Sequence, residues 1–285
     1  MHLKTVAAVT ALCAPLVTAA GVQAKDVVRP SSVRGAVMIE PAASSGVVLG
    51  CRTPAVALSG VVSRSGVGDL IWSRPGAELR DWDFEFAAAP RRRAAAELRC
   101  LRLRLPAGVR QAVLRVNTVR SDALALPART SRSVKLRCDR GYVPTGYGLE
   151  REGDVGIGAA VPGPHGWRFR VDNRGAAEAR AKLRIRCLQR SVSAASGDGE
   201  TTLRFAVRRP AFADSVMSGA GVGHSCGRRE YSLATGFENA PGSGLSITSS
   251  RPAGRRGGRW SFGGAAGNAQ VSTYLLCLGL GSRFR

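Results

Sequence analysis

One stretch of the chain contains Cys138, Thr145-Gly146-Tyr147-Gly148, Gly166-Trp167-Arg168-Phe169 and Leu183-Arg184-Ile185-Arg186-Cys187. The skeleton of this stretch occurs three times in the sequence. The upstream copy has Cys51, Gly60, Pro75, Trp82 and Cys100, and the downstream copy has Cys226, Gly236, Pro252, Trp260 and Cys277. The paired cysteines lie 49, 49 and 51 residues apart, and the copies begin 87 and 88 residues apart. A fixed period of this kind is typical of tandem repeats. The sequence therefore predicts three units of similar fold.

Alternation of apolar and charged residues is the main secondary-structure signal. It runs through Leu101-Arg102-Leu103-Arg104-Leu105, Val134-Lys135-Leu136-Arg137-Cys138 and Leu183-Arg184-Ile185-Arg186-Cys187. A period of two places apolar side chains on a buried face of a strand and charged ones on a face in water. The pattern shifts by one residue at Cys100, which indicates a bulge there. Glycine and proline clusters separate the strands, as they do in antiparallel sandwiches and barrels.

We therefore predict an all-β fold of three tandem, disulfide-stapled antiparallel β-sandwich domains. The expected divisions are 1–24 for a signal peptide, 25–105 for repeat 1, 106–192 for repeat 2 and 193–285 for repeat 3. One helical candidate, the alanine-rich run from Ala87 to Leu98, aligns with a glycine turn and a strand in the other copies. For that reason we predict a loop and a strand in this run.

The first 24 residues are typical of a secretory signal peptide. Lys4 precedes an uncharged apolar run, and Val22-Gln23-Ala24 forms a small-x-small cleavage site. The run is short for a membrane span. The alternatives are a retained N-terminal helix and lipid attachment at Cys13, although Leu12 before it departs from a lipoprotein box. We expect the mature chain to be secreted or at the cell surface, with no transmembrane segment.

Six cysteines follow the leader, an even number that suits an oxidising compartment. The repeat favours pairing within each copy: Cys51 with Cys100, Cys138 with Cys187, and Cys226 with Cys277. The alternative pairs Cys100 with Cys138 and Cys187 with Cys226, leaving Cys51 for Cys277. The chain has no short Cys-x-x-Cys spacing, so we expect no zinc site.

Two families resemble this pattern in different degrees. Bonded cysteines around a core tryptophan resemble the immunoglobulin (Ig-like) sandwich, but here the tryptophan precedes the second cysteine instead of closely following the first. Cys138, Thr145-Gly146-Tyr147-Gly148, Gly166-Trp167 and Cys187 more closely resemble the tandem Cys…Thr-Gly-x-Gly…Gly-Trp…Cys repeats of uncharacterised secreted proteins from GC-rich bacteria. The other copies keep only parts of the turn, Ser59-Gly60 and Thr235-Gly236. This resemblance covers nearly the whole mature chain, implies an extracellular β-rich module, and implies no activity.

The net charge is +22, and almost all the positive charge is arginine. A charge of this size attracts polyanions, and guanidinium groups suit phosphate, sulfate and carboxylate. The alternative is a solvated surface, because most arginines alternate with apolar residues instead of clustering. The candidate polyanion-binding residues are Arg91, Arg92, Arg93, Arg228, Arg229, Arg255, Arg256 and Arg259. Arg208-Arg209 and Arg283 with Arg285 are further clusters.

Few residues could carry catalysis. His165 and His224 are the two histidines after the leader, and we expect both to be exposed loop residues. Asp81 and Asp83 lie on one predicted strand, where they balance arginines better than they form a glycosidase pair. The glycines of Gly153–Gly158 lack the strand–turn–helix context of a dinucleotide loop. We expect no catalytic residue, cofactor or metal.

The sequence thus predicts a secreted, non-catalytic structural or adhesive protein. The alternative is a cell-envelope protein that binds a polyanion: an acidic wall polymer, a polysaccharide or extracellular DNA. Neither a recognition helix nor an aromatic row supports sequence-specific nucleic-acid binding. Another surface protein is a further candidate partner, and a hydrolase is the third hypothesis.

Overall fold

The computed structural model describes residues 28–64, 70–76, 78–104, 109–196, 199–217, 220–239, 246–263 and 269–279. These residues form antiparallel strands and turns and contain no helix, which confirms the predicted all-β class. The predicted leader, Cys13, Arg283 and Arg285 lie outside the described residues.

Repeat 1 is built from two three-stranded layers. Its strands are β1 (Val28–Ile39), β2 (Ser45–Gly50), β3 (Val56–Arg64), β4 (Leu70–Pro75), β5 (Asp81–Phe86) and β6 (Arg92–Leu103). One layer has the order β2-β5-β4 and carries Trp82, and the other has the order β1-β6-β3 and carries Cys100. The alanine-rich run is a loop followed by β6, as the repeat predicted.

Repeats 2 and 3 use the same strand order. Repeat 2 contains β8 (Val116–Arg120), β9 (Leu124–Leu126), β10 (Ser131–Arg137), β11 (Tyr142–Glu152), β12 (Val155–Gly163), β13 (Gly166–Asn173) and β14 (Ala179–Gln189). Repeat 3 contains β17 (Val207–Arg208), β18 (Ala211–Val216), β19 (Gly221–Ser225), β20 (Glu230–Asn239), β21 (Ser246–Ala253), β22 (Gly257–Gly263) and β23 (Ala269–Gly279). The tryptophan layers are β10-β13-β12 and β19-β22-β21, and the cysteine layers are β11-β14-β8 and β20-β23-β17.

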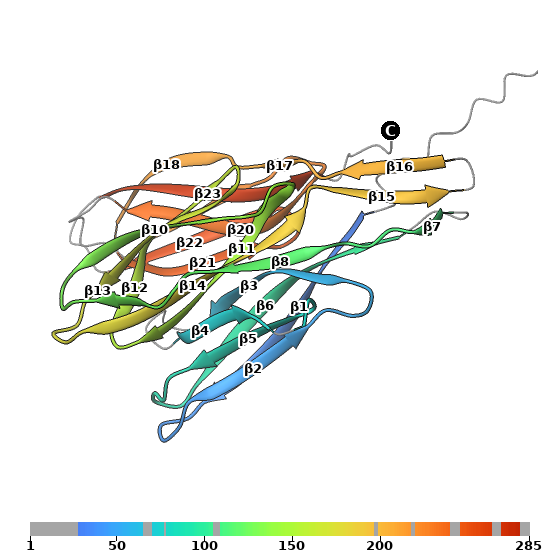
Figure 1. Cartoon of the computed structure of the whole chain (residues 1–285). Helices are drawn as coiled ribbons and strands as arrows, with labels where there is room; N and C mark the ends of the chain where they lie inside the picture. The colour runs from blue at the N-terminus through green and yellow to red at the C-terminus, as the bar shows by residue number, and fades with distance from the viewer. Residues whose placement is uncertain are drawn as a thin grey trace, which may run out of the picture.

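The connections between repeats form one further sheet. It comprises β7 (Val109–Gln111), β15 (Ser191–Ser196) and β16 (Gly199–Arg204), in the order β16-β15-β7, and it lies at one end of the molecule (Figure 1). Residue 106 is outside the described part of the chain and Ser193 lies within β15. The expected domain boundaries therefore stay predictions.

Each repeat holds its two layers together in the same way. Disulfides join Cys51 to Cys100, Cys138 to Cys187, and Cys226 to Cys277, which are the pairs within each copy. The indoles of Trp82, Trp167 and Trp260 are at most 2% exposed. In repeat 1, Trp82 Nε1 donates to Ser73 Oγ at 2.9 Å, so the one polar atom of this indole is satisfied inside the core.

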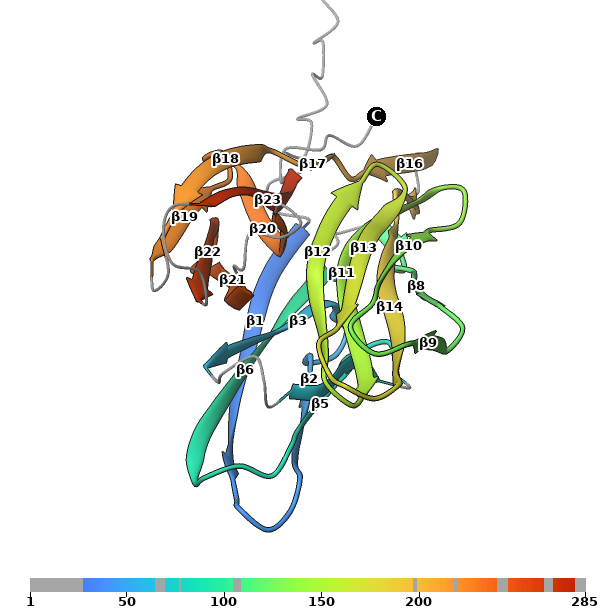
Figure 2. The same ribbon diagram turned by 90° about the vertical axis from the view of Figure 1, so that its left-hand side faces the viewer.

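The repeats are not structurally independent domains, because they share β-sheets. Edge strand β4 of repeat 1 pairs with β11 of repeat 2, and β12 of repeat 2 pairs with β20 of repeat 3. Each junction fuses a tryptophan layer and the next repeat's cysteine layer into one seven-stranded sheet. At the third junction β21 lies against β3, so repeat 3 returns to repeat 1. Figure 2 shows the three repeats as lobes around a common centre.

The centre is formed by the first strand after each opening cysteine, namely β3, β11 and β20. Thr145 Oγ1 donates to Leu58 O at 2.9 Å and lies between repeats 1 and 2. A Cβ on Gly146 would lie 2.6 Å from Leu58 O, so only glycine allows this approach of two backbones. Val56, Leu58 and Leu101 of repeat 1 belong to the core that repeats 2 and 3 share.

Each of these strands has a bulge at the same place in the repeat. The ladder skips one residue between Ala57 and Ser59, Pro144 and Gly146, and Ser232 and Ala234. Gly60, Tyr147 and Thr235 therefore occupy equivalent positions, each opposite the residue two positions before the second cysteine, and the repeated glycines Gly146 and Gly236 lie one residue away from this position. The bulge expected near Cys100 lies in β3, opposite it, while the β1–β6 ladder is regular.

Candidate polyanion-binding surface

The eight predicted arginines are all exposed but fall into two groups. Arg91 precedes β6, and Arg92 and Arg93 begin it, opposite Ile39 and Met38 of β1. Arg91 Nε lies 3.6 Å from a carboxylate oxygen of Glu40, so part of this charge is offset locally. The remaining five arginines belong to repeat 3, and the structure therefore does not bring all eight together.

Two turns of repeat 3 bring four arginines together. Arg228 and Arg229 lie between Cys226 and β20, and Arg255 and Arg256 lie in the turn between β21 and β22. Cys226 N donates to Arg256 O at 2.9 Å and Ser232 N donates to Arg255 O at 3.1 Å, which joins the two turns. All four of these arginines are exposed to solvent.

Arg259 extends this charge along β22. It lies opposite Arg251 of β21, which the sequence did not single out. Like charges directly opposite each other on neighbouring strands repel, and an anionic ligand would relieve this repulsion. The sequence could not show this pairing, because it depends on the register between β21 and β22. A bulge in β21 shifts that register by one residue between Ile247 and Ser249.

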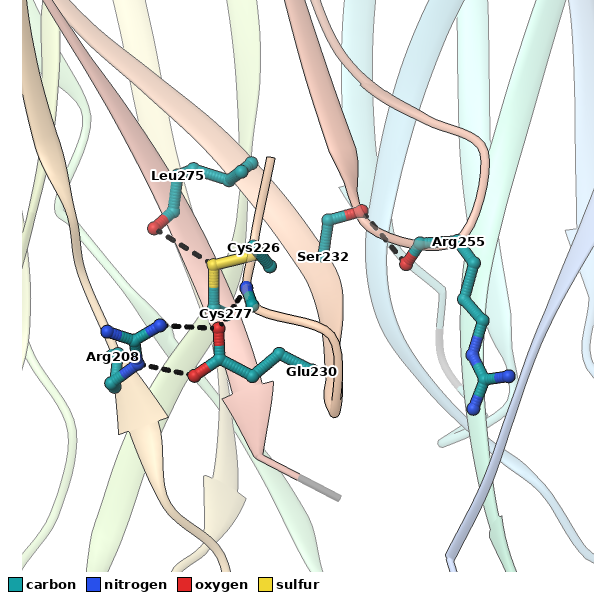
Figure 3. The surroundings of a disulfide bond; sticks show 8 residues. Arg208, Cys226, Glu230, Ser232, Arg255, Leu275 and Cys277 are labelled. Atoms are coloured by element: carbon teal, nitrogen blue, oxygen red, sulfur yellow. Dashed lines mark hydrogen bonds and ion pairs between the residues drawn. A yellow bond between two sulfur atoms is a disulfide. The ribbon is translucent and has the colours of Figure 1, made fainter. Parts of the chain in front are cut away.

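Glu230 is the one carboxylate of these turns, and it is already bonded. Figure 3 shows its two oxygens facing the guanidinium of Arg208, and Gly227 N also donates to it. The hydrogen bond from Arg208 holds the pKa of Glu230 below its usual value, assisted by Gly227 N–H and opposed by burial. Arg208 is thereby offset, whereas the four turn arginines have no carboxylate bonded to them in the described residues.

A metal site at the same place is excluded by the disulfide. The ligand atoms of Cys226, Glu230 and Cys277 lie within 4.8 Å of one another. However, the two sulfurs are bonded to each other and the carboxylate is bonded to Arg208 (Figure 3). Thiolate is the form of cysteine that binds metals, so this cluster is structural.

His224 is not the exposed loop residue that we expected. It lies in β19 with 21% of its side chain exposed, stacks on Phe212 at 3.8 Å, and has Nε2 3.0 Å from Asp214 Oδ2. Thr273 Oγ1 donates to the same carboxylate at 2.7 Å. Both the hydroxyl and the imidazole thus face Asp214, and a triad would instead need the hydroxyl on the imidazole. His165 lies exposed in the β12–β13 turn, as predicted.

The carboxylates of the β5 strand also have structural partners. Asp83 lies 3.4 Å from Arg74 Nε, and Arg74 Nη1 reaches Glu150 at 3.3 Å. Glu150 also pairs with Arg184. This chain of alternating charges crosses the junction between repeats 1 and 2. It agrees with the prediction that these acids balance arginines.

Two arginines of the cysteine strands are buried, contrary to the alternation rule. Arg99 and Arg186 each precede a second cysteine and are 2% and 1% exposed, because the neighbouring repeat covers them. Arg99 pairs with Glu97 at 3.0 Å and donates to Tyr231 Oη at 3.1 Å. The guanidinium of Arg186 lies 6.0 Å from the centre of the Trp82 ring, and burial lowers its pKa to about 10 against an opposing effect of Asp81.

One shallow pocket of about 440 Å³ opens near the first junction. It is lined by Ile71, Ala87, Arg151, Gly153 and Asp154. Arg151 Nε and Nη1 donate to Leu70 O and Val155 O, both at 2.7 Å. These bonds fix the guanidinium to the backbone, and burial lowers its pKa. Gly153 and Asp154 form the turn between β11 and β12, which belong to different sheets, and Val155–Gly158 begins β12, so this region is not a phosphate loop.

Comparison of the chain with protein-family models and with curated proteins finds no match. The described residues contain no helix with the length and apolarity needed to cross a membrane. Three disulfides are typical of proteins that mature in an oxidising compartment.

Proposed function

We propose that the chain is a secreted, non-catalytic structural or adhesive protein of the cell surface. The observation that carries this proposal is the closed arrangement of three disulfide-stapled repeats. The residues that the repeat preserves, cysteine and tryptophan, are buried and serve packing. The acidic residues that could serve catalysis, Asp214, Asp83 and Glu150, are bonded to neighbouring side chains, which supports the same interpretation.

Adhesion of coated beads tests the proposal. Beads carrying the oxidised protein should attach to cells of the producing organism, and beads carrying reduced and alkylated protein should not. Turnover of chromogenic esters, glycosides or peptides by the purified chain, lost on Asp214→Asn, would instead support an enzyme.

A second candidate function is polyanion binding, and one specific observation favours it. The joined turns of repeat 3 carry four exposed arginines, Arg228, Arg229, Arg255 and Arg256, and the single carboxylate of these turns is already bonded to Arg208. Retention on immobilised heparin at about 0.15 M salt, near physiological screening, supports this function. Elution well below that salt would leave the charge as solvated surface.

A further inference from the structure

The turn ends of repeats 2 and 3 are built alike. In repeat 2, Cys138 N donates to His165 O at 2.7 Å, which joins the β10–β11 and β12–β13 turns just as Cys226 N and Arg256 O do in repeat 3. Arg140 lies exposed in the first of these turns. Arg190 follows β14, and its N–H donates to Gly141 O at 2.7 Å. Repeat 2 therefore has its own basic end.

The dipeptide Arg208-Arg209 connects the two ends. Arg209 Nη2 donates to Pro164 O in the β12–β13 turn of repeat 2 at 3.3 Å. Arg208 is bonded to Glu230 in the turn of repeat 3. Consecutive residues thus contact both ends, so the basic surfaces of the two repeats adjoin. Figure 3 shows Arg208 and Arg255 on opposite sides of the Cys226–Cys277 disulfide, so positively charged side chains lie on both sides of this bond.

The connected turns carry little opposing charge. They contain eight arginines, which we call the arginine band: Arg140, Arg190, Arg208, Arg209, Arg228, Arg229, Arg255 and Arg256. Their two carboxylates are Asp139, bonded to Asn117, and Glu230, bonded to Arg208, which leaves a net charge of +6. Burial and then the positive charge of Arg190 lower the pKa of Arg209, in keeping with an excess of cations here.

We propose that the arginine band is the binding surface for a linear acidic polysaccharide that spans repeats 2 and 3. The proposal rests on the polyanion-binding function and names its surface. A linear chain suits a row of guanidinium groups from two repeats, and each group can fork onto sulfate or carboxylate. The aromatic residues of the described turns, Phe205 and Tyr231, are buried, and Tyr142 is half-buried. Base stacking, which supports single-stranded nucleic-acid binding, therefore has no platform in these turns.

Two triple variants with the same loss of charge test the location. Arg228→Gln/Arg229→Gln/Arg256→Gln removes charge from the band. Arg91→Gln/Arg92→Gln/Arg93→Gln removes the same charge from repeat 1, at the start of β6 and outside the band. Heparin affinity is measured from about 0.05 to about 0.3 M salt, a range over which counterion release changes affinity strongly. The first variant should weaken binding by about tenfold or more and reduce the slope of log K against log salt by about two to three. The distal variant should change affinity less than about twofold.

A third variant and a second ligand complete the test. Arg140→Gln/Arg190→Gln should weaken binding of long heparin chains, but it should leave a heparin disaccharide on the repeat 3 turns unaffected. Single-stranded DNA of matched charge should bind more weakly than heparin. Circular dichroism and the absence of free thiols check that each variant is folded.

Each contrary outcome has its own meaning. If the unmodified protein does not bind heparin, the polyanion-binding function itself is wrong. If binding occurs and both triple variants weaken it equally, net charge alone attracts the ligand and the band is wrong. Tighter binding of DNA than of heparin would overturn the polysaccharide class. No effect of the repeat 2 variant on long chains would overturn the span across two repeats.

Discussion

The two buried arginines before the second cysteines should respond in opposite ways to the same substitution. Arg99, Arg186 and Leu276 occupy equivalent positions and are 2%, 1% and 0% exposed. Repeat 3 shows that leucine fits this position, because Leu276 is fully buried in the core that the repeats share. We therefore predict that Arg186→Leu stabilises the protein and that Arg99→Leu destabilises it.

The magnitude for Arg186→Leu comes from its missing partners. Nε and Nη2 of Arg186 are buried without a hydrogen-bond partner among the described residues. A pKa lowered to about 10 means that burial disfavours the charged side chain by about 3 kcal/mol, at about 1.4 kcal/mol per pKa unit. Loss of the contact with Trp82 offsets about 1 kcal/mol. The variant should be more stable by about 1 to 3 kcal/mol.

Nε and Nη2 of Arg99 also lack a hydrogen bond in the described part of the chain. However, the guanidinium of Arg99, unlike that of Arg186, forms an ion pair with Glu97 and donates to Tyr231 Oη, and the opposite result for Arg99→Leu follows from these two partners. The variant leaves Glu97 and the Tyr231 hydroxyl buried without this partner, although Arg34 still lies 3.0 Å from Glu97. Breaking a buried pair usually costs about 3 to 5 kcal/mol, and the remaining Arg34 contact reduces this to about 2 to 4 kcal/mol. Guanidinium unfolding of the oxidised protein, followed by tryptophan fluorescence, measures both values. Equal destabilisation by the two substitutions would refute the reasoning.

The remaining predictions concern the bridges, the first junction and high pH. Cys138→Ser/Cys187→Ser opens a loop of 49 residues and should lower the free energy of unfolding by about 4 kcal/mol. A change below about 1 kcal/mol would contradict the stabilising role of this disulfide. Gly148→Ala places a Cβ 2.0 Å from Ser73 O, a backbone atom of repeat 1, and should destabilise the protein by about 2 kcal/mol or more. In the control variant Gly46→Ala, the nearest atom to the new Cβ is 3.4 Å away. Equal melting temperatures for the two variants would contradict the close approach of β11 to β4. Burial raises the pKa of the Tyr147 and Tyr231 phenols. Their neutral forms therefore contribute fully to stability below about pH 10, the usual pKa of a phenol. This contribution is lost as the pH rises above that value. Phenolate absorbance should therefore show two of the four tyrosines ionising only as the fold is lost, and early ionisation of all four would contradict their burial.

The sequence was sufficient for features that the repeat itself encodes. The spacing predicted the three cysteine pairs, and alternation predicted the buried faces that carry Trp82, Trp167 and Trp260. Comparison between copies also identified the run before Cys100 as loop and strand, although its composition favours a helix. These features depend on local periodicity, which one chain reveals when it repeats itself.

The junctions between repeats could not be predicted in the same way. Periodicity states which face of β14 is apolar but not that repeat 1 covers its other face, so Arg186 was expected in water. The sequence aligns the repeated glycines with one another, but the strand registers make Tyr147 and Thr235 the counterparts of Gly60, and the bulge that the three strands share has no sequence signal. For the candidate surface, the sequence located the arginine clusters. It did not show that Glu230 offsets Arg208 or that Arg251 faces Arg259.

The closed arrangement of the three repeats depends most on the return of repeat 3 to repeat 1. A double-mutant cycle with Arg99→Leu and Tyr231→Phe measures this contact directly, because the two residues lie 132 positions apart and touch only through the third junction. Tyr231 Oη also donates to Ser31 O at 2.8 Å, so each single variant should be less stable. We predict a coupling energy of about 1 to 2 kcal/mol between the two sites. Additive effects, with a coupling energy near zero, would contradict the closed arrangement.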